Sequence, residues 1–495
     1  MWNACGYFAA INQPNQIVMK KIILFSFITT LAILTACKKD DESFKSPEIT
    51  APANSTAVIG TEIDITFDFT SEGGFSTSDV SATNGSAAIK TNGTAGSTSG
   101  SVVVTYTAGT NIGAGSVTLT ITDSKNQTGS ATAVVSVVEE ELVVNVNGNI
   151  TSNTTWETGK IYVLESRIAV VSGVTLTIQP GVIVKGQAGT GANATALLIA
   201  RGGKLMAEGT ASSPIIFTSV ADEILPGNIA SPNLDPTLNG LWGGLIILGN
   251  APISADAASV QIEGIPPSDQ NGLYGGSDAT DNSGVIKFVS IRHGGANIGE
   301  GNEINGLTLG GVGSGTIIEN IEVVANQDDG IEWFGGTVNV KNVIIWNAGD
   351  DAVDTDQSWG GTLDNFIVVN PGDECFELDG PEGTMEAGHI LKNGTVYAGI
   401  ADGLVDLDDN SIVEMSGIYF FGLKSGQDFD LNPVALVASD LQATLPDGGI
   451  VTDYFKAGSD AFVTTVTTGA NTVGADVTKF ATWSWASVSG ALTDF

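Results

Sequence analysis

Apolar and polar residues alternate in short runs along most of this chain. In the run 63–69, isoleucine and phenylalanine alternate with aspartate and threonine, and in the run 117–122 aliphatic residues alternate with threonine. A period of two is typical of strands that bury one face. Other runs, such as 174–178 and 214–218, are separated by glycine, asparagine and aspartate. No segment has the apolar period of about 3.6 residues that marks a helix, so the pattern predicts an all-β protein.

The runs divide the chain into two predicted domains. Residues 47–138 hold alternating strands between turns rich in serine, glycine and asparagine, which predicts a small immunoglobulin-like β-sandwich. The acidic triplet at 139–141 follows it and marks the boundary. We expect this sandwich to act as a spacer, with ligand binding as its alternative role.

The second domain shows a sequence repeat. Asn326, Asn347 and Asn370 each open a segment of turn residues and acids, at spacings of 21 and 23 residues. A period of this length, made of short strands and tight turns, predicts a parallel β-helix with one coil per repeat. We assign residues 143–495 to this β-helix and expect the aromatic residues of 480–485 to cap its open end. The three asparagines are expected to stack as an internal ladder between coils.

Four segments of the second domain carry a resemblance to a known family. They are VTLTIQPG at 174–181, ARGGKL at 200–205, WGGLIILG at 242–249 and RHGGAN at 292–297. These segments resemble the right-handed β-helix lipoproteins of Bacteroidota, a mostly uncharacterised family. The resemblance covers roughly residues 143 to 495. It implies a right-handed parallel β-helix and says little about activity.

The beginning of the chain predicts export and lipidation. The lysine pair after Met19 precedes the apolar run 22–34, and Leu34-Thr35-Ala36-Cys37 closes it. This predicts a signal peptide over residues 1–36, with the true start at Met19. The closing residues resemble the lipobox of bacterial lipoproteins, which implies lipidation of Cys37 and a tether over 37–46. The charged segment 38–42 resembles the tag of surface lipoproteins of Bacteroidota, so we expect a lipid-anchored protein of the outer membrane that faces outward.

Composition narrows the classes of partner. The chain has 55 acidic and 19 basic residues, a formal net charge of −36, with 42% hydrophobic residues. These values are globular, and the charge excludes binding to nucleic acid or anionic lipid by electrostatics. A carboxylate-rich protein of this kind suits divalent cations. Cys375 is the one cysteine left beyond Cys37, so no intramolecular disulfide is expected, and we expect Cys375 to be buried.

Strand alternation predicts a ladder of carboxylates on the outside of the β-helix. In the segment 351–356, Val353 and Thr355 share one face of the strand, and Asp354 and Asp356 share the other. Because the apolar set must fill the interior, the acids point outward. The next two coils repeat the pattern, so the sequence predicts a two-by-three grid that Glu332 extends. Its six members are Asp354, Asp356, Glu377, Asp379, Asp406 and Asp408.

Three interpretations of this ladder stay open. The first is a Ca²⁺ site formed by the same six carboxylates. The second is acid/base catalysis on a polysaccharide, with Asp354, Asp356, Glu377 and Asp379 as the candidate residues of a glycoside hydrolase or lyase. The third is an exposed face of solvated charges, which aids solubility.

The turns before the ladder have a partial resemblance to polygalacturonase-type β-helix glycosidases. The segments 326–328 (NQD) and 349–351 (GDD) resemble the aspartate motifs that carry hydrolysis in that family. The family's Gly-His-Gly and Arg-x-Lys motifs are missing downstream, because no arginine follows Arg292 and only His389 remains. Ordinary turn roles for these aspartates are therefore favoured, and His293 is expected to be structural.

Aromatic residues flank the ladder. Trp333 and Trp359 are each followed closely by two glycines, and Tyr397 lies further along. Such rings can form a platform on which a sugar stacks, so we name these three as candidate ligand-binding residues. The alternative is that the rings close the hydrophobic interior.

The combined prediction is an outer-membrane lipoprotein that binds an extracellular polymer. A glycan is the expected ligand, with calcium as the expected cofactor. Two alternatives stay open: a polysaccharide hydrolase or lyase that acts through the ladder, and an accessory or structural partner of an outer-membrane transporter. Binding of nucleic acid is not expected.

Overall fold

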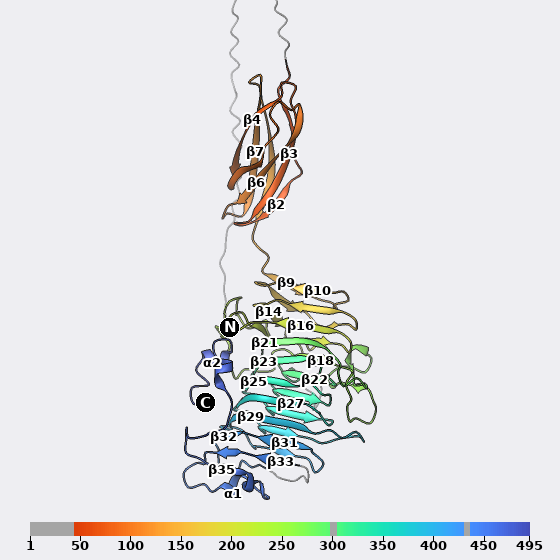
Figure 1. Ribbon diagram of the computed structural model, residues 1–495, viewed down its shortest axis with the longest axis vertical. Helices are drawn as coiled ribbons and strands as arrows, with labels where there is room; N and C mark the ends of the chain where they lie inside the picture. The colour runs from red at the N-terminus through yellow and green to blue at the C-terminus, as the bar shows by residue number, and fades with distance from the viewer. Residues whose placement is uncertain (1–43, 298–303, 430–435) are drawn as a thin grey trace, which may run out of the picture. The chain divides into compact units, whose positions relative to one another are not determined.

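The structure is a computed structural model, and it describes residues 44–297, 304–429 and 436–495. The chain divides into two compact units between Glu140 and Glu141 (Figure 1). The predicted signal peptide and the lipidation site at Cys37 lie outside the described residues. Within the described part of the chain, no helix is long and apolar enough to cross a membrane.

The first unit is a sandwich of two four-stranded sheets. In the strand β3, Ile65, Phe67 and Phe69 are buried and alternate with exposed polar residues, as the period of two requires. The strand orders are β1-β3-β6-β5 in one sheet and β2-β8-β7-β4 in the other. Strand β2 pairs in parallel with β8, whereas the other pairs of the two sheets are antiparallel. The strands are β1 (Glu48–Thr50), β2 (Ser55–Val58), β3 (Glu62–Thr70), β4 (Phe75–Thr83), β5 (Gly85–Thr91), β6 (Ser99–Ala108), β7 (Gly113–Asp123) and β8 (Thr128–Val138).

The second unit is a parallel β-helix, so the predicted all-β fold class is confirmed. Its coils stack from β9 and β10 to β33 and β35 (Figure 1). One wall of the coils is an eight-stranded parallel sheet. Its strands are β12 (Arg167–Val170), β15 (Ala196–Ile199), β18 (Leu245–Leu248), β22 (Leu307–Gly310), β24 (Ile331–Phe334), β26 (Val353–Asp356), β28 (Phe376–Leu378) and β30 (Asp406–Leu407).

The other two sides of the coils belong to a 17-stranded parallel sheet, whose two rows of strands join where β21 pairs with both β16 and β17. Its strands are β9 (Val143–Val146), β10 (Thr154–Trp156), β11 (Ile161–Leu164), β13 (Thr175–Ile178), β14 (Ile183–Gly186), β16 (Lys204–Glu208), β17 (Ile215–Ser219), β21 (Gly284–Arg292), β23 (Ile317–Val324), β25 (Val340–Trp346), β27 (Thr362–Val369), β29 (His389–Tyr397), β31 (Val413–Ser416), β32 (Tyr419–Phe421), β33 (Val437–Ser439), β34 (Leu441–Ala443) and β35 (Val463–Thr465). A short hairpin of β19 (Val260–Gln261) and β20 (Leu273–Tyr274) lies in the loop that joins β18 to β21. The α-helices are α1 (Val451–Tyr454) and α2 (Trp485–Val488).

An asparagine ladder joins consecutive coils, but it is not the predicted one. Asn342 donates from Nδ2 to Asn320 Oδ1 over 3.1 Å, and Asn365 donates from Nδ2 to Asn342 Oδ1 over 2.7 Å. All three have left-handed backbone, with φ of 57° to 64°, in the middle of strands β23, β25 and β27. The predicted ladder of Asn326, Asn347 and Asn370 is wrong. Asn326 and Asn347 donate instead to the carbonyls of Ile304 and Pro236, which belong to other segments.

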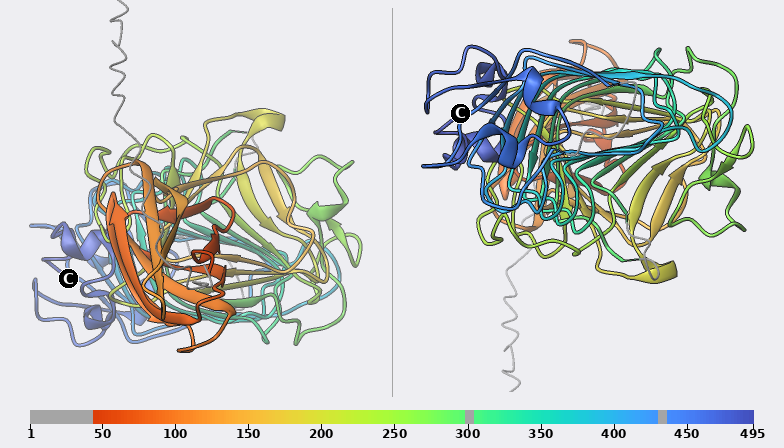
Figure 2. Two further views of the ribbon diagram at one scale, coloured as in Figure 1. Left: turned by 90° about the horizontal axis from the view of Figure 1, so that it is seen from above. Right: turned by 90° about the horizontal axis from the view of Figure 1, so that it is seen from below.

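The aromatic residues of the C-terminal segment were predicted to cap the open coil, and this prediction is wrong. Phe480, Trp483 and Trp485 pack on the outer side of β23, β25 and β27. Trp483 meets Phe288 at 5.6 Å between ring centroids, and Trp485 meets Trp346 at 5.8 Å. The views along the stack show this segment beside the coils (Figure 2). The prediction failed because the outward apolar residues of these strands form a second hydrophobic surface that needs cover.

The anchor of this C-terminal segment is Glu322, which is fully buried. Its carboxylate accepts the backbone N–H groups of Trp485 at 3.1 Å and Ala486 at 2.8 Å. Arg292, also fully buried, forms an ion pair with it at 3.7 Å and lies over the Trp485 ring. The chain end is therefore held by charge as well as by apolar contact.

Candidate functional site

Ten carboxylates lie in three columns on the outer face of the eight-stranded sheet, and we call this set the carboxylate grid. The middle column follows the strand register, which pairs Glu332 with Asp354, Asp354 with Glu377, and Glu377 with Asp406. The neighbouring positions Val353, Phe376 and Leu378 point inward and are fully buried, so the acids must point outward. The members are Asp329, Glu332, Asp351, Asp354, Asp356, Glu374, Glu377, Asp379, Asp406 and Asp408.

A first column, which the strand alternation did not reveal, lies in the turns before the strands. Asp351 donates its backbone N–H to Asp329 Oδ1 at 3.0 Å, and Glu374 donates likewise to Asp351 Oδ1 at 2.6 Å. The turn acids therefore stack coil on coil. The sequence did carry a signal for them, because acids recur at positions i, i+3 and i+5 in 351–356 and in 374–379.

The third column stands at the ends of the strands. Asp356 closes β26, and Asp379 follows β28 and donates its backbone N–H to the carbonyl of Thr355 at 2.8 Å. Asp408 occupies the same offset after β30. Six of the ten carboxylates are those predicted from alternation, and Glu332 extends the set as proposed.

Solvent exposure changes along the grid. Asp329, Glu332 and Asp351 are buried, Asp356, Glu377 and Asp379 are half-buried, and Asp406 and Asp408 are exposed. The loop between β18 and β21 covers the outer face of the earlier strands, where Ile253 and Tyr274 pack with Phe334. This loop meets the later coils where Gly383 donates to the carbonyl of Ser254 at 2.6 Å. The third interpretation of the ladder, an exposed face of fully solvated charges, therefore does not describe most of the grid.

Burial raises the pKa of most grid members. It raises the pKa of Asp356 to about 7, with Asp379 as the next contributor, and the pKa of Asp379 to about 7, with Asp408 as the next. Burial, followed by a hydrogen bond with Glu377, raises the pKa of Asp351 to about 11. The pKa values of Glu332 and Asp354 are also raised well above the usual range, first by burial and then by neighbouring carboxylates. At neutral pH the grid must hold protons or bind cations.

No basic side chain balances the grid. Among the described residues, none of the ten carboxylates forms an ion pair with lysine or arginine. Arg292 pairs with Glu322, and Arg167 pairs with Asp269 at 3.6 Å. The guanidinium of Arg201 donates hydrogen bonds to the Ser259 hydroxyl and to the carbonyl of Gly275. Within the described residues, no basic side chain neutralises the grid, so protons or bound cations must do so.

Two groups of carboxylates are close enough to share a metal ion. Ligand atoms of Asp329, Glu332 and Asp354 lie within 4.8 Å of one another, and so do those of Asp328, Asp329 and Asp350. Of the six predicted calcium ligands, only Asp354 belongs to such a group within the described chain. The other five, Asp356, Glu377, Asp379, Asp406 and Asp408, form no such group there.

The predicted sugar platform is wrong for both tryptophans. Trp333 and Trp359 are fully buried inside the coils and stack on each other at 4.6 Å between ring centroids. His389 continues this internal stack at 5.3 Å from Trp359. Tyr397 lies on β29 in the other sheet, beside Phe421 and Phe495. The glycines after the tryptophans shape tight turns and leave no exposed ring.

The remaining reactive side chains are also buried. Cys375 is free and fully buried, where burial raises the pKa of its thiol. Burial lowers the pKa of His389 to about 3, so its imidazole is neutral. His293 is fully buried, and its Nδ1 is bonded to the carbonyl of Leu238 at 2.5 Å. These groups belong to the core.

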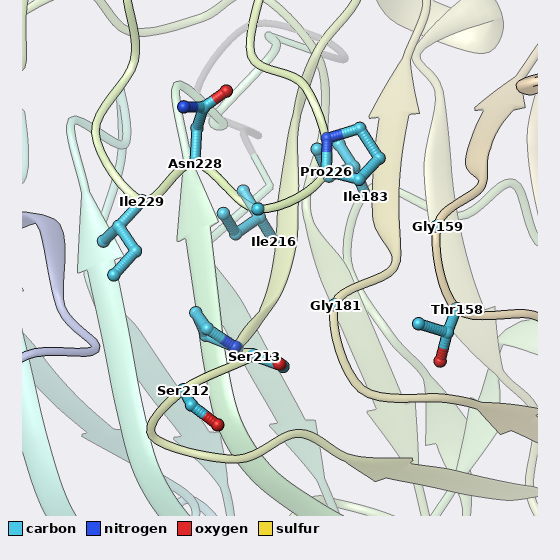
Figure 3. A pocket seen from close by; sticks show the side chains of 12 residues that line it. Thr158, Gly159, Gly181, Ile183, Ser212, Ser213, Ile216, Pro226, Asn228 and Ile229 are labelled. Atoms are coloured by element: carbon cyan, nitrogen blue, oxygen red, sulfur yellow. The ribbon is translucent and has the colours of Figure 1, made fainter.

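A separate small pocket opens on the side of the early coils (Figure 3). Its cavity measures about 200 Å³ and lies beside Ile183 and Ile216. Its lining is aliphatic with a few hydroxyl and amide groups and has no charged side chain. The lining residues are Thr158, Gly159, Gly181, Ile183, Ser212, Ser213, Pro214, Ile216, Pro226, Gly227, Asn228 and Ile229. It offers no group for acid/base chemistry, and the grid remains the candidate site.

Comparison with known proteins identifies the fold of the second unit. A family model described as a pectate-lyase-like β-helix domain matches residues 148–399, which include the grid as far as Asp379. No curated protein matches the chain. Among solved structures, a family 28 exopolygalacturonase of Yersinia enterocolitica is 10% identical, with 85% of this chain and 90% of that chain covered and a TM-score of 0.20. The catalytic unit of a GH87 α-1,3-glucanase from Streptomyces thermodiastaticus is 13% identical, with 87% and 89% covered and a TM-score of 0.30.

Proposed function

The chain belongs to the family of pectate-lyase-like β-helix domains, and we propose that it binds an extracellular glycan along the carboxylate grid. The observation that carries this proposal is the accessible part of the grid. Asp356, Glu377 and Asp379 are half-buried and stand beside the exposed Asp406 and Asp408. Strands stack about 4.8 Å apart, so these side chains offer a regular row of acceptors to a linear chain.

The chemistry of the grid limits the class of glycan. Carboxylates accept strong hydrogen bonds from hydroxyl or ammonium groups. With no lysine or arginine paired to the grid in the described chain, a polyanionic glycan would meet uncompensated repulsion. A neutral or amine-bearing glycan fits the grid directly. An acidic glycan requires a bound divalent cation.

Hydrolysis is the second candidate function, and one observation favours it. Asp356 and Asp379 lie on adjacent coils, and the pKa of each is raised to about 7. Near neutral pH, one of the two carboxyls can hold a proton while the other is ionised. That division of roles is the one a glycosidase needs, and carboxyl groups about 5–5.5 Å apart suit a retaining mechanism. Asp354 and Glu377 lie beside them in the middle column, on β26 and β28, and complete the four predicted acid/base residues.

The location of the protein is part of the proposal. The lipobox at Cys37 and the charged segment behind it support a lipid-anchored protein on the outer face of the outer membrane. Replacement of Cys37 by alanine is expected to release the protein from membranes, and protease added to intact cells is expected to digest the wild type. A role as partner of an outer-membrane transporter is the alternative if no glycan binds.

The test is a screen of purified full-length protein against neutral, amine-bearing and acidic glycans, with and without Ca²⁺. Retention and new reducing or unsaturated ends are scored together. Glycan retention that falls at least tenfold in the double variant Asp356→Asn/Asp379→Asn supports binding at the grid. The matched control is Glu414→Gln, an exposed acid on β31 of the other sheet. No retention of any glycan, or equal loss in the control, overturns the proposal. New saturated reducing ends that vanish in the double variant establish hydrolysis, and unsaturated ends that vanish there establish a lyase.

A further inference from the structure

The deepest part of the grid is a corner lined almost entirely by side-chain oxygens. Thr308 pairs in register with Glu332 on the next coil, and Asn305 precedes Thr308 by the same offset that separates Asp329 from Glu332. Three consecutive coils therefore contribute to it. The side chains are Asn305, Thr308, Asp329, Glu332, Asp351 and Asp354, with exposures of 0%, 3%, 7%, 6%, 3% and 9%.

Two oxygens in this corner are buried without a partner. Asn305 donates from Nδ2 to Glu332 Oε2, while its own Oδ1 has no hydrogen-bond partner. Asp354 Oδ1 is likewise buried and without a partner. An orphaned buried acceptor destabilises the fold, and it does so more strongly when it is charged. Four carboxylates meet in this corner, and none has a basic partner among the described residues, so the corner is strongly unbalanced in charge.

We propose that this corner binds one divalent cation, calcium, through Asp329, Glu332 and Asp354, with the Asn305 side-chain oxygen as a neutral ligand. Oxygens bind calcium at about 2.3–2.6 Å, so opposite ligands stand about 5 Å apart. The three carboxylate atoms lie within 4.8 Å of one another and meet that requirement. The Asp329 carboxylate is already fixed, because its Oδ1 accepts the backbone N–H of Asp351 at 3.0 Å.

The burial of the corner favours calcium over magnesium. Magnesium keeps several water ligands and sheds them reluctantly, whereas calcium accepts six to eight protein oxygens in flexible geometry. The closed corner supplies carboxylate and amide oxygens and leaves little access for water ligands. The bound ion would join the coils of β22, β24 and β26, and it would leave Asp356, Glu377 and the outer acids to face a ligand. This inference does not depend on the identity of the glycan.

The experiment is calcium titration of the full-length protein after chelation, followed by calorimetry and by thermal melting. One calcium per chain and a higher melting midpoint are expected in the wild type. Glu332→Gln is expected to weaken calcium binding at least tenfold, and Asn305→Leu, which keeps every carboxylate, is expected to weaken it more mildly. Glu414→Gln is expected to match the wild type. Circular dichroism of each variant separates loss of the ion from loss of the fold.

Three outcomes would overturn the inference. They are the absence of calcium binding in the wild type, unchanged affinity in Glu332→Gln, and loss of binding in Asp406→Asn/Asp408→Asn with Glu332→Gln unaffected. Glycan retention is measured on the same preparations. Retention without calcium binding overturns the cation site alone, and calcium binding without retention of any glycan overturns the glycan proposal alone.

Discussion

Replacing Glu322 by glutamine tests whether charge, rather than apolar contact alone, holds the C-terminal segment on the β-helix. The glutamine keeps the shape of the side chain and can still accept one N–H. It removes the negative charge that the buried Arg292 guanidinium faces at 3.7 Å. It also weakens the bonds from Trp485 and Ala486, which the carboxylate accepts at 3.1 and 2.8 Å.

The magnitude follows from the environment of Arg292. Breaking a buried ion pair by removing one partner costs about 3–5 kcal/mol, because a charge is left uncompensated. Arg292 is fully buried, and both of its terminal nitrogens already lack a hydrogen-bond partner. We therefore expect Glu322→Gln to lower the free energy that holds the segment in place by about 3 kcal/mol or more. The segment should open locally before the coils unfold.

Hydrogen exchange and limited proteolysis of residues 474–495 measure this opening directly. The control is the double variant Arg292→Met/Glu322→Leu, which removes both charges and keeps apolar bulk. It is expected to be less destabilised than Glu322→Gln, because buried pairs are often replaceable by apolar residues. If Glu322→Gln leaves exchange in 474–495 within tenfold of the wild type, or if the double variant opens more than the single one, the charge argument is refuted.

Three further predictions follow from the core and the grid. In calcium-free protein, the pKa values of Asp356 and Asp379 in the folded state are raised to about 7 from the usual 3.8. The stability that these two groups add is therefore fully present below about pH 4 and is lost as pH rises through about 7. Denaturant midpoints at pH 5 and pH 8 check this, and a midpoint that rises with pH contradicts it. Asn342→Ala removes a donor and an acceptor of the asparagine ladder and places alanine at a φ of 57°. We expect it to lower the free energy of unfolding by about 2–4 kcal/mol. Asn342→Gly, in which glycine tolerates this backbone, should lower it clearly less, and equal losses of stability in the two variants would exclude backbone strain. Cys375, fully buried, should react with a thiol reagent only after unfolding, and rapid labelling of native protein would show that its coil opens.

The fold could be predicted from sequence because the interior fixes the register. Val353, Phe376 and Leu378 must point inward, and a shift by one residue would bury the acids and expose this set. The middle column of the grid followed from that constraint. Asp329, Asp351 and Glu374 lie in turns, where alternation carries no information, and they were missed for that reason.

Long-range contacts explain the other differences between the sequence predictions and the structure. Trp333 and Trp359 looked like surface rings because glycines follow them, yet the width of the coil interior accommodates both rings in a stack. The loop between β18 and β21, far away in sequence, packs on Phe334, two residues beyond Glu332. The asparagine ladder forms within the strands, at Asn320, Asn342 and Asn365, although the predicted members Asn347 and Asn370 also have positive φ. None of these pairings has a local signal.

The parallel pairing of β2 with β8 gives the first unit a mechanical property. Tension applied between the residues before β2 and the residues after β8 would pull β2 from its N-terminal end and β8 from its C-terminal end. The register joins Ser55 with Val135 through to Val58 with Val138, so the force would run along the strands and load these hydrogen bonds together in shear. Bonds loaded in shear break together, whereas bonds in an unzipping geometry break one after another. Tension applied at these two points would therefore break the β2–β8 pair as a unit rather than one bond at a time.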